Sequence, residues 1–328
     1  MRALSNVNAL TIAEAVAAAQ QASTGGQAFA FSGGGTDLLQ QIKDGTAPVD
    51  VIINLRTVSD ASQVSASPTE TVIGGLITLT DLAVDQTLAA RMTVLTQAAA
   101  SVATPQIRNV ATLAGNVTQR PWCWYYRNGF QCFKAGGNQC FSVNGENQQH
   151  AIFGGGPSFI VHPSDTAPAL VALGATFEVA GTSGNRSVTA DEFFVLPSQN
   201  PARENSLQAT ELLAGVRIPA PAANSVSTYF KVTDREAWTH AEVSVAVVLE
   251  RDGAAIGKAN VVLGGVAPIP WRLPEVERFL IGKSLDAAIA QQAGVMAIAN
   301  AQPLAKNQHK LPMTSAAVER ALLRLVAA

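Results

Sequence analysis

The segment from Arg120 to His150 constrains the fold of this 328-residue chain more than any other feature. It is rich in glycine and shows neither helical nor strand periodicity, which predicts a long loop wrapped around other structure. It contains all three cysteines of the chain and seven of its nineteen aromatic side chains. An odd number of cysteines cannot all pair within one chain, so the pattern argues against a disulfide scaffold.

The clustering of the three cysteines favours a metal cofactor, although their spacing matches no common motif. Eight residues separate the first two cysteines and seven separate the last two, which fits neither zinc knuckles nor ferredoxins. Arg120, Arg127 and Lys134 lie nearby in the sequence, and no acidic residue follows before Glu146. A positive surround suits thiolates that bind an anionic iron–sulfur cluster. The alternative is three buried, apolar cysteines in an aromatic loop.

Regular structure is predicted on both sides of this segment. The first 60 residues indicate an α/β unit, with a helix at 11–21, strands at 28–32 and 51–55, and a helix at 37–44. Thr11 is placed to cap the first helix, with Glu14 three residues on. Beyond residue 224 the pattern predicts antiparallel strands at 227–232, 243–250 and 258–264, followed by helices at 274–281, 286–300 and 313–326.

Composition excludes several classes of protein. Hydrophobic residues make up 48% and charged residues 14%, so the chain is not disordered. The net charge of −2 excludes a broadly basic nucleic-acid-binding protein. No apolar stretch approaches the roughly 18 residues of a membrane span, and no secretory signal is visible, so the chain by itself is expected to be cytoplasmic. The low charge indicates either surface covered by other subunits or an alanine-rich composition bias.

Two loops have the composition of phosphate-binding turns. Ser32 to Asp37 carries three consecutive glycines between a predicted strand and a predicted helix, so its N–H groups could converge on a phosphate. Its spacing is neither that of a Rossmann fold nor that of a P-loop, and the alternative is a tight turn with a helix cap. Ala111 to Asn116 is a second loop of small residues. Two such loops favour a pyrophosphate ligand.

A third motif, His162-Pro-Ser-Asp165, precedes a helix predicted to begin near Thr166. Asp165 could cap that helix through its carboxylate. It could instead accept a hydrogen bond from a ribose or ribityl hydroxyl group. The residues alone leave both roles open.

These motifs together resemble the FAD-binding subunits of the xanthine dehydrogenase and aldehyde oxidoreductase family of molybdenum hydroxylases. The matching segments run in the order of the family through most of the chain: Phe31–Leu38, Gln106–Asn116, His162–Ala169, Tyr229–Val232 and Leu263–Arg272. The cysteine-bearing insertion at 119–159 resembles the branch of the family whose insertion binds a [4Fe–4S] cluster.

The resemblance implies an α+β fold: a two-subdomain FAD-binding fold of the vanillyl-alcohol-oxidase (PCMH) type, then an α+β C-terminal domain with an antiparallel sheet. The expected division is 1–60 for the first FAD-binding subdomain and 61–222 for the second, which carries the insertion. Residues 223–328 would form the C-terminal flavoprotein domain.

The resemblance also implies which residues bind FAD. The first loop would hold the pyrophosphate, with Phe31, Ser32, Gly33, Gly34, Gly35, Thr36, Asp37 and Leu38. The second loop would contribute Thr112, Gly115 and Asn116, and Ser164 and Asp165 would bind the sugar or ribityl part. Leu213 would bond the flavin through its backbone. Lys231 would lie near the isoalloxazine edge, where a cation stabilises reduced flavin.

The cluster site departs from the pattern of this branch. A fourth cysteine usually lies four residues before the His-Pro-Ser-Asp motif, and this chain has Ser158 there. We therefore expect Cys123, Cys132 and Cys140 to bind a cluster, [4Fe–4S] in type, whose fourth iron has a non-cysteine ligand. Ser158 is the first candidate, followed by water or His150. The alternative is an insertion that has kept its fold and lost its cluster.

The expected function is that of an FAD-binding electron-transfer subunit, with no catalytic side chain of its own. A molybdopterin-binding large subunit would oxidise an aldehyde or N-heterocycle, and a [2Fe–2S] subunit would pass the electrons to FAD. This obligate hetero-oligomer would be periplasmic if a signal-bearing partner exported it. One alternative is a self-sufficient FAD oxidase, with Tyr125, Tyr126 or His240 as its base. Another is a non-catalytic metal-binding or assembly module.

Overall fold

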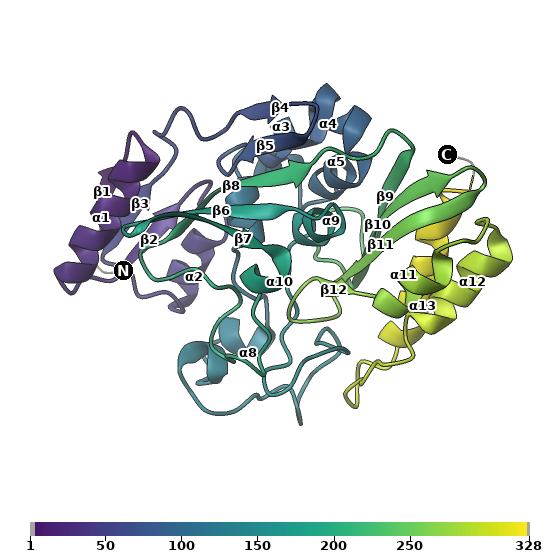
Figure 1. Cartoon of the computed structure of the whole chain (residues 1–328). Helices are drawn as coiled ribbons and strands as arrows, with labels where there is room; N and C mark the ends of the chain where they lie inside the picture. Colours follow the sequence, from purple (N-terminus) through teal and green to yellow (C-terminus); the bar gives the residue numbers. More distant parts are fainter. Residues whose placement is uncertain (1–3, 327–328) are drawn as a thin grey trace.

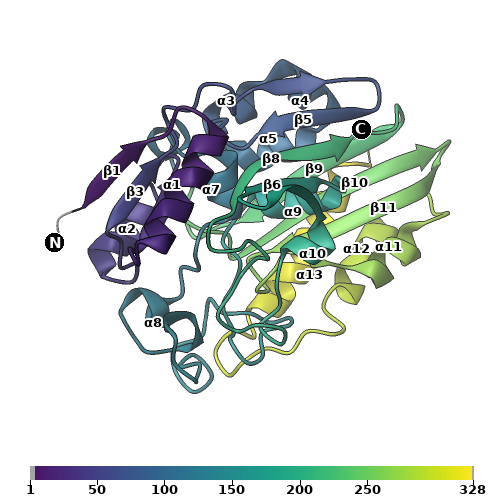
Figure 2. The same cartoon turned by 60° about the vertical axis from the view of Figure 1, so that its left-hand side comes forward.

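A computed structural model describes residues 4–326 of the chain (Figures 1 and 2). The first sheet is parallel, with the strand order β1-β3-β2, formed by β1 (Ser5–Asn8), β2 (Phe29–Ser32) and β3 (Val51–Asn54). Parallel neighbours need crossover connections, which α1 (Ile12–Thr24) and α2 (Leu38–Asp44) supply. The predicted α/β unit is confirmed. Strand β1 was not predicted, because its four residues are all exposed and carry no apolar alternation.

Small apolar residues hold α1 against this sheet. Ala15, Val16 and Ala19 are buried in one cluster with Val51 and Ile53 of β3. Thr11 caps the helix as predicted, because its hydroxyl accepts the N–H of Glu14 at 3.1 Å.

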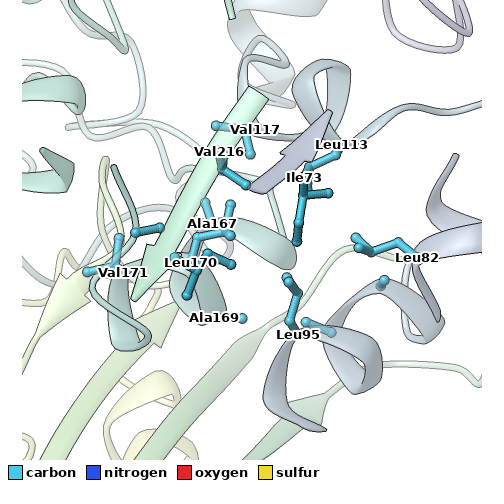
Figure 3. Close-up of a cluster of buried hydrophobic side chains, with 14 of the residues drawn as sticks. Ile73, Leu82, Leu95, Leu113, Val117, Ala167, Ala169, Leu170, Val171 and Val216 are labelled. Atoms are coloured by element: carbon cyan, nitrogen blue, oxygen red, sulfur yellow. The ribbon is translucent and has the colours of Figure 1, made fainter. Parts of the chain in front are cut away.

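The second sheet is antiparallel, with the order β4-β5-β8-β6-β7. Its strands are β4 (Val64–Ala66), β5 (Glu70–Gly74), β6 (Thr176–Gly181), β7 (Gly184–Thr189) and β8 (Leu212–Pro219). The helices of this region are α3 (Leu79–Val84), α4 (Gln86–Arg91), α5 (Thr93–Ala100), α6 (Pro105–Arg108), α7 (Leu113–Val117), α9 (Thr166–Ala172) and α10 (Ala190–Phe193). Figure 3 shows Ile73 and Val216 of the sheet facing Leu95 and Leu170 of the helices in one apolar core.

The third sheet is antiparallel, with the order β12-β11-β10-β9. It comprises β9 (Ser225–Val232), β10 (Val243–Asp252), β11 (Ala255–Gly264) and β12 (Trp271–Arg272), followed by α11 (Pro274–Leu280), α12 (Ala287–Met296) and α13 (Lys310–Leu323). The predicted strands and closing helices are confirmed.

Both faces of β10 are buried, which ties the C-terminal part to the rest of the molecule. Ala246 and Val248 belong to the core that contains α5 and α9, whereas Val245, Val247 and Leu249 belong to the core beneath α11–α13. Because side chains alternate along a strand, this one strand contributes to two cores.

The cysteine segment has little regular structure, as predicted. It contains α8 (Trp124–Arg127) and the 3₁₀ turn η1 (Phe133–Ala135), with irregular backbone between and after them. Figures 1 and 2 both place α8 at the end of the molecule opposite β5. Within residues 4–326, no helix combines the length and apolar character needed to cross a membrane.

Candidate functional site

The glycine loop between β2 and α2 lies directly against the second predicted loop. A Cβ atom on Gly34 would lie 2.0 Å from the carbonyl oxygen of Val110, and one on Gly33 would lie 2.7 Å from Oγ1 of Thr112. Gly35 has a φ of +72°, a backbone region that favours glycine. The glycines are therefore required by the close approach of two backbone segments far apart in the sequence.

The backbone of the glycine loop presents free hydrogen-bond donors. Among residues 4–326, the N–H groups of Gly33, Gly34, Gly35 and Thr36 have no acceptor. All four residues line a cavity of about 990 Å³, at the upper end of the roughly 300–1,000 Å³ typical of ligand pockets. Consecutive unpaired amides form an anion-binding concavity, so this end of the cavity fits a pyrophosphate.

The second loop is braced by its own side chains. The Thr112 hydroxyl accepts the N–H of Gly115 at 3.1 Å and so caps α7. Oδ1 of Asn116 accepts hydrogen bonds from the hydroxyl groups of Ser164 at 2.6 Å and Thr166 at 2.7 Å. Asn116 therefore joins this loop to the His-Pro-Ser-Asp motif at the floor of the cavity.

Asp165 does not cap a helix. Its carboxylate makes no capping hydrogen bond to α9; it accepts the Tyr229 hydroxyl at 2.7 Å and the Lys231 ammonium at 2.8 Å. The Asp165 and Lys231 side chains are only 6% and 7% exposed, so each charge is neutralised where water is nearly excluded. Burial, with the adjacent Asp165 carboxylate, raises the pKa of Tyr229 well above its usual value.

His162 lies beside this group as a neutral side chain. Burial lowers its pKa to about 4, and its Nδ1 accepts the N–H of Ser164 at 3.4 Å. Its ring meets the Phe194 ring edge to face, with 5.1 Å between centroids. His162 therefore shapes the cavity wall without adding charge.

The structure brings most of the predicted FAD-binding residues to one cavity. Thirteen of the fifteen line it: Phe31, Ser32, Gly33, Gly34, Gly35, Thr36, Asp37, Leu38, Thr112, Gly115, Asn116, Ser164 and Asp165. Leu213 and Lys231 do not line it. Leu213 is buried in β8, and Lys231 lies behind Asp165.

Cys123 lines the same cavity, whereas Cys132, Cys140 and Ser158 do not. All three cysteines are free thiols. Burial raises the pKa of Cys123 to about 11, and its Sγ lies 3.4 Å from Nε2 of His150. Within residues 4–326, no three His, Cys, Asp or Glu side chains converge on the position of a single metal ion.

The positive surround expected for the cysteines is largely neutralised by carboxylates from distant segments. Arg120 and Lys134 both pair with Glu204, at 2.6 and 2.9 Å, and Arg127 pairs with Asp37 at 2.7 Å. Three cations therefore face two carboxylates. The sequence could not reveal Glu204 as a partner, because it lies 70 residues beyond Lys134.

Two residues at the rim of the cavity, Ala103 and Trp238, were not predicted from the sequence. Ala103 and Trp238 both line it with positive φ values, of 41° and 58°, and the N–H of Trp238 donates to the carbonyl oxygen of Ala103 at 3.2 Å. The His240 ring packs against Trp122 at the same rim, with 5.2 Å between centroids. Neither a turn motif nor an apolar period marks Ala103 or Trp238 in the sequence, because the contact between their two segments sets their backbone conformation.

Known families match almost the whole chain. Residues 3–221 match the FAD-binding domain of molybdopterin dehydrogenases, and residues 228–325 match the C-terminal domain of the carbon monoxide dehydrogenase flavoprotein. The chain is 34% identical over 325 residues to the aldehyde oxidoreductase FAD-binding subunit PaoB of Escherichia coli, covering 95% of this chain and 94% of that one. The chain belongs to the family of FAD-binding subunits of molybdopterin dehydrogenases.

Further relatives of this flavoprotein subunit belong to enzymes named for different substrates. The carbon monoxide dehydrogenase medium chain of Afipia carboxidovorans is 26% identical, over 89% of this chain and 86% of that one. Solved structures with the same fold include carbon monoxide dehydrogenase from Hydrogenophaga pseudoflava, with a TM-score of 0.77 and 24% identity over 98% of this chain and 96% of that one. Another is quinoline 2-oxidoreductase from Pseudomonas putida 86, with a TM-score of 0.76 and 22% identity over 99% of this chain and 98% of that one. The flavoprotein subunit is thus part of an oxidoreductase, and the expected fold class is confirmed.

Proposed function

We propose that this subunit holds FAD in the cavity, receives electrons from the [2Fe–2S] clusters of a partner subunit and passes them to an external acceptor. The observation that carries the proposal is the row of unpaired amides from Gly33 to Thr36 at one end of a dinucleotide-sized cavity. FAD, when bound, supplies one- and two-electron chemistry that side chains lack. The protein binds and orients it.

The individual roles are proposed from the family resemblance and from the residues that line the cavity. The amides of the glycine loop bind the pyrophosphate, and the α7 loop with Thr112, Gly115 and Asn116 closes over it. Ser164 and Asp165, which also line the cavity, are proposed to bind the sugar or ribityl hydroxyl groups. Lys231 acts through its ion pair with Asp165. The role of Leu213 as a backbone partner of the flavin rests on the family resemblance alone.

The subunit is proposed to work within a heterotrimer, with a [2Fe–2S] subunit and a molybdopterin-binding large subunit. Exposed aromatic side chains near the cavity, Trp124 at 64% and Trp238 at 60%, support a covering partner. The 34% identity to an aldehyde oxidoreductase subunit supports an aldehyde substrate for the complex. The partners determine the compartment of the subunit. It is the cytoplasm, or the periplasm if one of the partners carries an export signal.

The proposed division of the chain gives residues 1–60 and 61–222 to the two FAD-binding subdomains and 223–328 to the C-terminal domain. The first two sheets lie within the first two ranges, and the third sheet lies within the last. The cavity is lined from all three ranges.

The flavin assignment is tested on the purified complex by releasing and counting the flavin. One FAD per chain is expected. A complex that contains no flavin, and gains no flavin absorbance when FAD is added, would contradict the assignment.

An iron–sulfur cluster on Cys123, Cys132 and Cys140 is the second part of the proposal. Three free thiols in one loop suit iron, and Cys123 on the cavity wall would place a cluster beside the flavin. The fourth ligand is proposed to be a non-cysteine group, with Ser158 as the first candidate and water or His150 next. The contact between His150 and Cys123 supports His150.

Iron and sulfide counts on the whole complex test this cluster. Totals above those of the partner's [2Fe–2S] clusters are expected, and they should fall to the partner's level in a Cys132→Ser variant. Totals that the partner accounts for in the unmodified complex would make the three cysteines structural.

A further inference from the structure

Asp37 connects the glycine loop to the cysteine segment. Its Oδ1 accepts a hydrogen bond from Nη2 of Arg127 at 2.7 Å, and its Oδ2 accepts one from the backbone N–H of Arg120 at 2.9 Å. The Nε2 atom of Gln41 also donates to Oδ2, at 2.9 Å. The carboxylate makes no capping bond to α2, although the residue stands at the N-cap position. Each of its two oxygens instead accepts a hydrogen bond from the cysteine segment, Oδ1 from Arg127 and Oδ2 from Arg120.

Three contacts within its own segment hold Arg127 in place. Its Nε donates to the carbonyl oxygen of Pro121 at 2.9 Å, and its Nη2 also donates to that of Arg120 at 3.0 Å. Its guanidinium lies over the Trp122 ring, 4.4 Å from the centroid. The side chain is 7% exposed, so its ion pair with Asp37 is shielded from water. Arg127 can therefore hold Asp37 in one place only while this segment is folded.

Arg120 extends the connection to the part of the loop between the second and third cysteines. Its Nη2 donates to the carbonyl oxygen of Lys134 at 3.1 Å, and its Nη1 pairs with Glu204. Lys134 lies in η1, directly after Cys132, and is itself 6% exposed. A continuous set of short bonds thus leads from the glycine loop through Asp37 and Arg120 to Lys134.

We propose that Asp37 is a positioning residue that makes FAD affinity depend on the folded cysteine segment. The inference rests on the proposed FAD site. The amides from Gly33 to Thr36 must point at one place to bind a pyrophosphate, and Asp37 is the next residue in the chain. Because coupling between sites is reciprocal, FAD must in turn stabilise the cysteine segment, including residues 131–141, which do not line the cavity.

The sign of the effect separates this role from simple electrostatics. A carboxylate close to a pyrophosphate repels it, so an Asp37→Asn change that acted only through charge would tighten FAD binding. The asparagine keeps the size of the side chain but loses the ion pair with Arg127. Positioning therefore predicts weaker binding, by about tenfold, equivalent to about 1.4 kcal/mol.

The test measures the FAD dissociation constant of the purified complex for wild type, D37N, R127M and the double variant. The single variants should each bind about tenfold more weakly, and the double variant should bind no more weakly than R127M, since both changes break one connection. R186M is the matched control, because Arg186 pairs with Glu211 away from the cavity. Its FAD affinity should equal that of wild type.

Hydrogen exchange gives a second readout, which a purely structural role would not change. FAD should slow amide exchange across 131–141 in wild type, and this response should disappear in R127M at saturating FAD. R127K is used in the same way if R127M does not fold, because lysine keeps the charge but loses the planar fork. Tighter binding in D37N, or an unchanged exchange response in the variants, would overturn the inference. A wild-type complex that binds no FAD would instead refute the proposed function.

Discussion

Single residues decide whether the two loops of the flavin site can meet. Gly34 leaves room for the backbone of Val110, and the neutral His162 fills the wall beside Ser164 without adding charge. Each residue affects the cavity. Gly34 sets how closely the two loop segments approach, and His162 sets the polarity of the wall. Each allows a prediction at this scale.

A Gly34→Ala variant should lose FAD affinity by about tenfold or more. The new Cβ would lie 2.0 Å from the carbonyl oxygen of Val110, so the two loops must separate; overpacking of this kind costs about 1–3 kcal/mol. A fluorescence titration with FAD measures the loss. Gly25→Ala is the control, since Gly25 has a φ of −76° and its added Cβ would meet ordinary contacts of 3.4 Å or more. Equal affinities for the two variants would contradict the steric explanation.

His162 should make the protein less stable as the pH falls from about 6.5 to about 4. Burial lowers its folded pKa to about 4 from an ordinary value of 6.5, so the unfolded chain takes up the proton first. The stability present above pH 6.5 is therefore lost across this window, by at most about 3 kcal/mol for this group.

Urea unfolding of wild type and His162→Gln at both ends of this pH window measures the effect. The variant should lose less unfolding free energy than wild type, because other acidic groups titrate alike in both proteins. Identical pH slopes would show that His162 is not responsible.

At the scale of elements, ion pairs buried between segments hold the cavity together. Asp165 at the start of α9 pairs with Lys231 of β9, and Asp37 at the start of α2 pairs with Arg127 of α8. Both aspartates occupy positions where a helix cap would be predicted, yet neither makes a capping bond. A hydrogen bond between a carboxylate and a cation is stronger than one between a carboxylate and a neutral backbone N–H, so each aspartate binds the cation from another element.

A Lys231→Met variant should lose about 3–5 kcal/mol of unfolding free energy, because it leaves the Asp165 carboxylate buried without its cation. The double variant D165N/K231M should regain part of this loss, since its asparagine is uncharged and still accepts the Tyr229 hydroxyl. Urea unfolding measures both. The control is Lys258→Met: Lys258 and Glu250 pair at 3.0 Å with side chains 60% and 34% exposed, so the loss should stay below about 1 kcal/mol. A double variant less stable than K231M would contradict this account.

At the scale of the whole molecule, the cavity is shared by parts of the chain that lie far apart in the sequence. Residues of the first sheet's glycine loop, of the cysteine segment and of the stretch between β9 and β10 all line it. The third sheet meets the helices of the FAD-binding part through one face of β10, together with Tyr229 of β9 and Val262 of β11. The molecule should therefore respond to a ligand as a unit.

FAD should stabilise both ends of the chain together. At a free concentration of about 100 times Kd, a ligand that binds only the folded state adds about 2.7 kcal/mol to the unfolding free energy. Thermal unfolding should remain a single transition that moves upward, with slower amide exchange in both β3 and β10. Two transitions, of which FAD moves only one, would show that the sheets unfold independently.

The sequence by itself determined the elements and the candidate flavin loops of this protein. Helices and strands follow from the spacing of apolar side chains and from caps such as Thr11, which act within a few residues. The three consecutive glycines after β2 predicted a turn whose N–H groups converge on a phosphate. The segments that match the family then indicated FAD as the ligand. Thirteen of the fifteen FAD-binding residues that this resemblance implied line one cavity.

Only the tertiary structure decided which charges pair. It joined Asp165 to Lys231, Asp37 to Arg127, and Glu204 to both Arg120 and Lys134. The physical reason is that a charge removed from water requires an opposite charge within a few ångströms, and the fold chooses that partner by proximity in space. Local patterns in the sequence carry no record of that proximity, so they left a helix cap open as a role for both aspartates and indicated an unopposed positive surround for the cysteines.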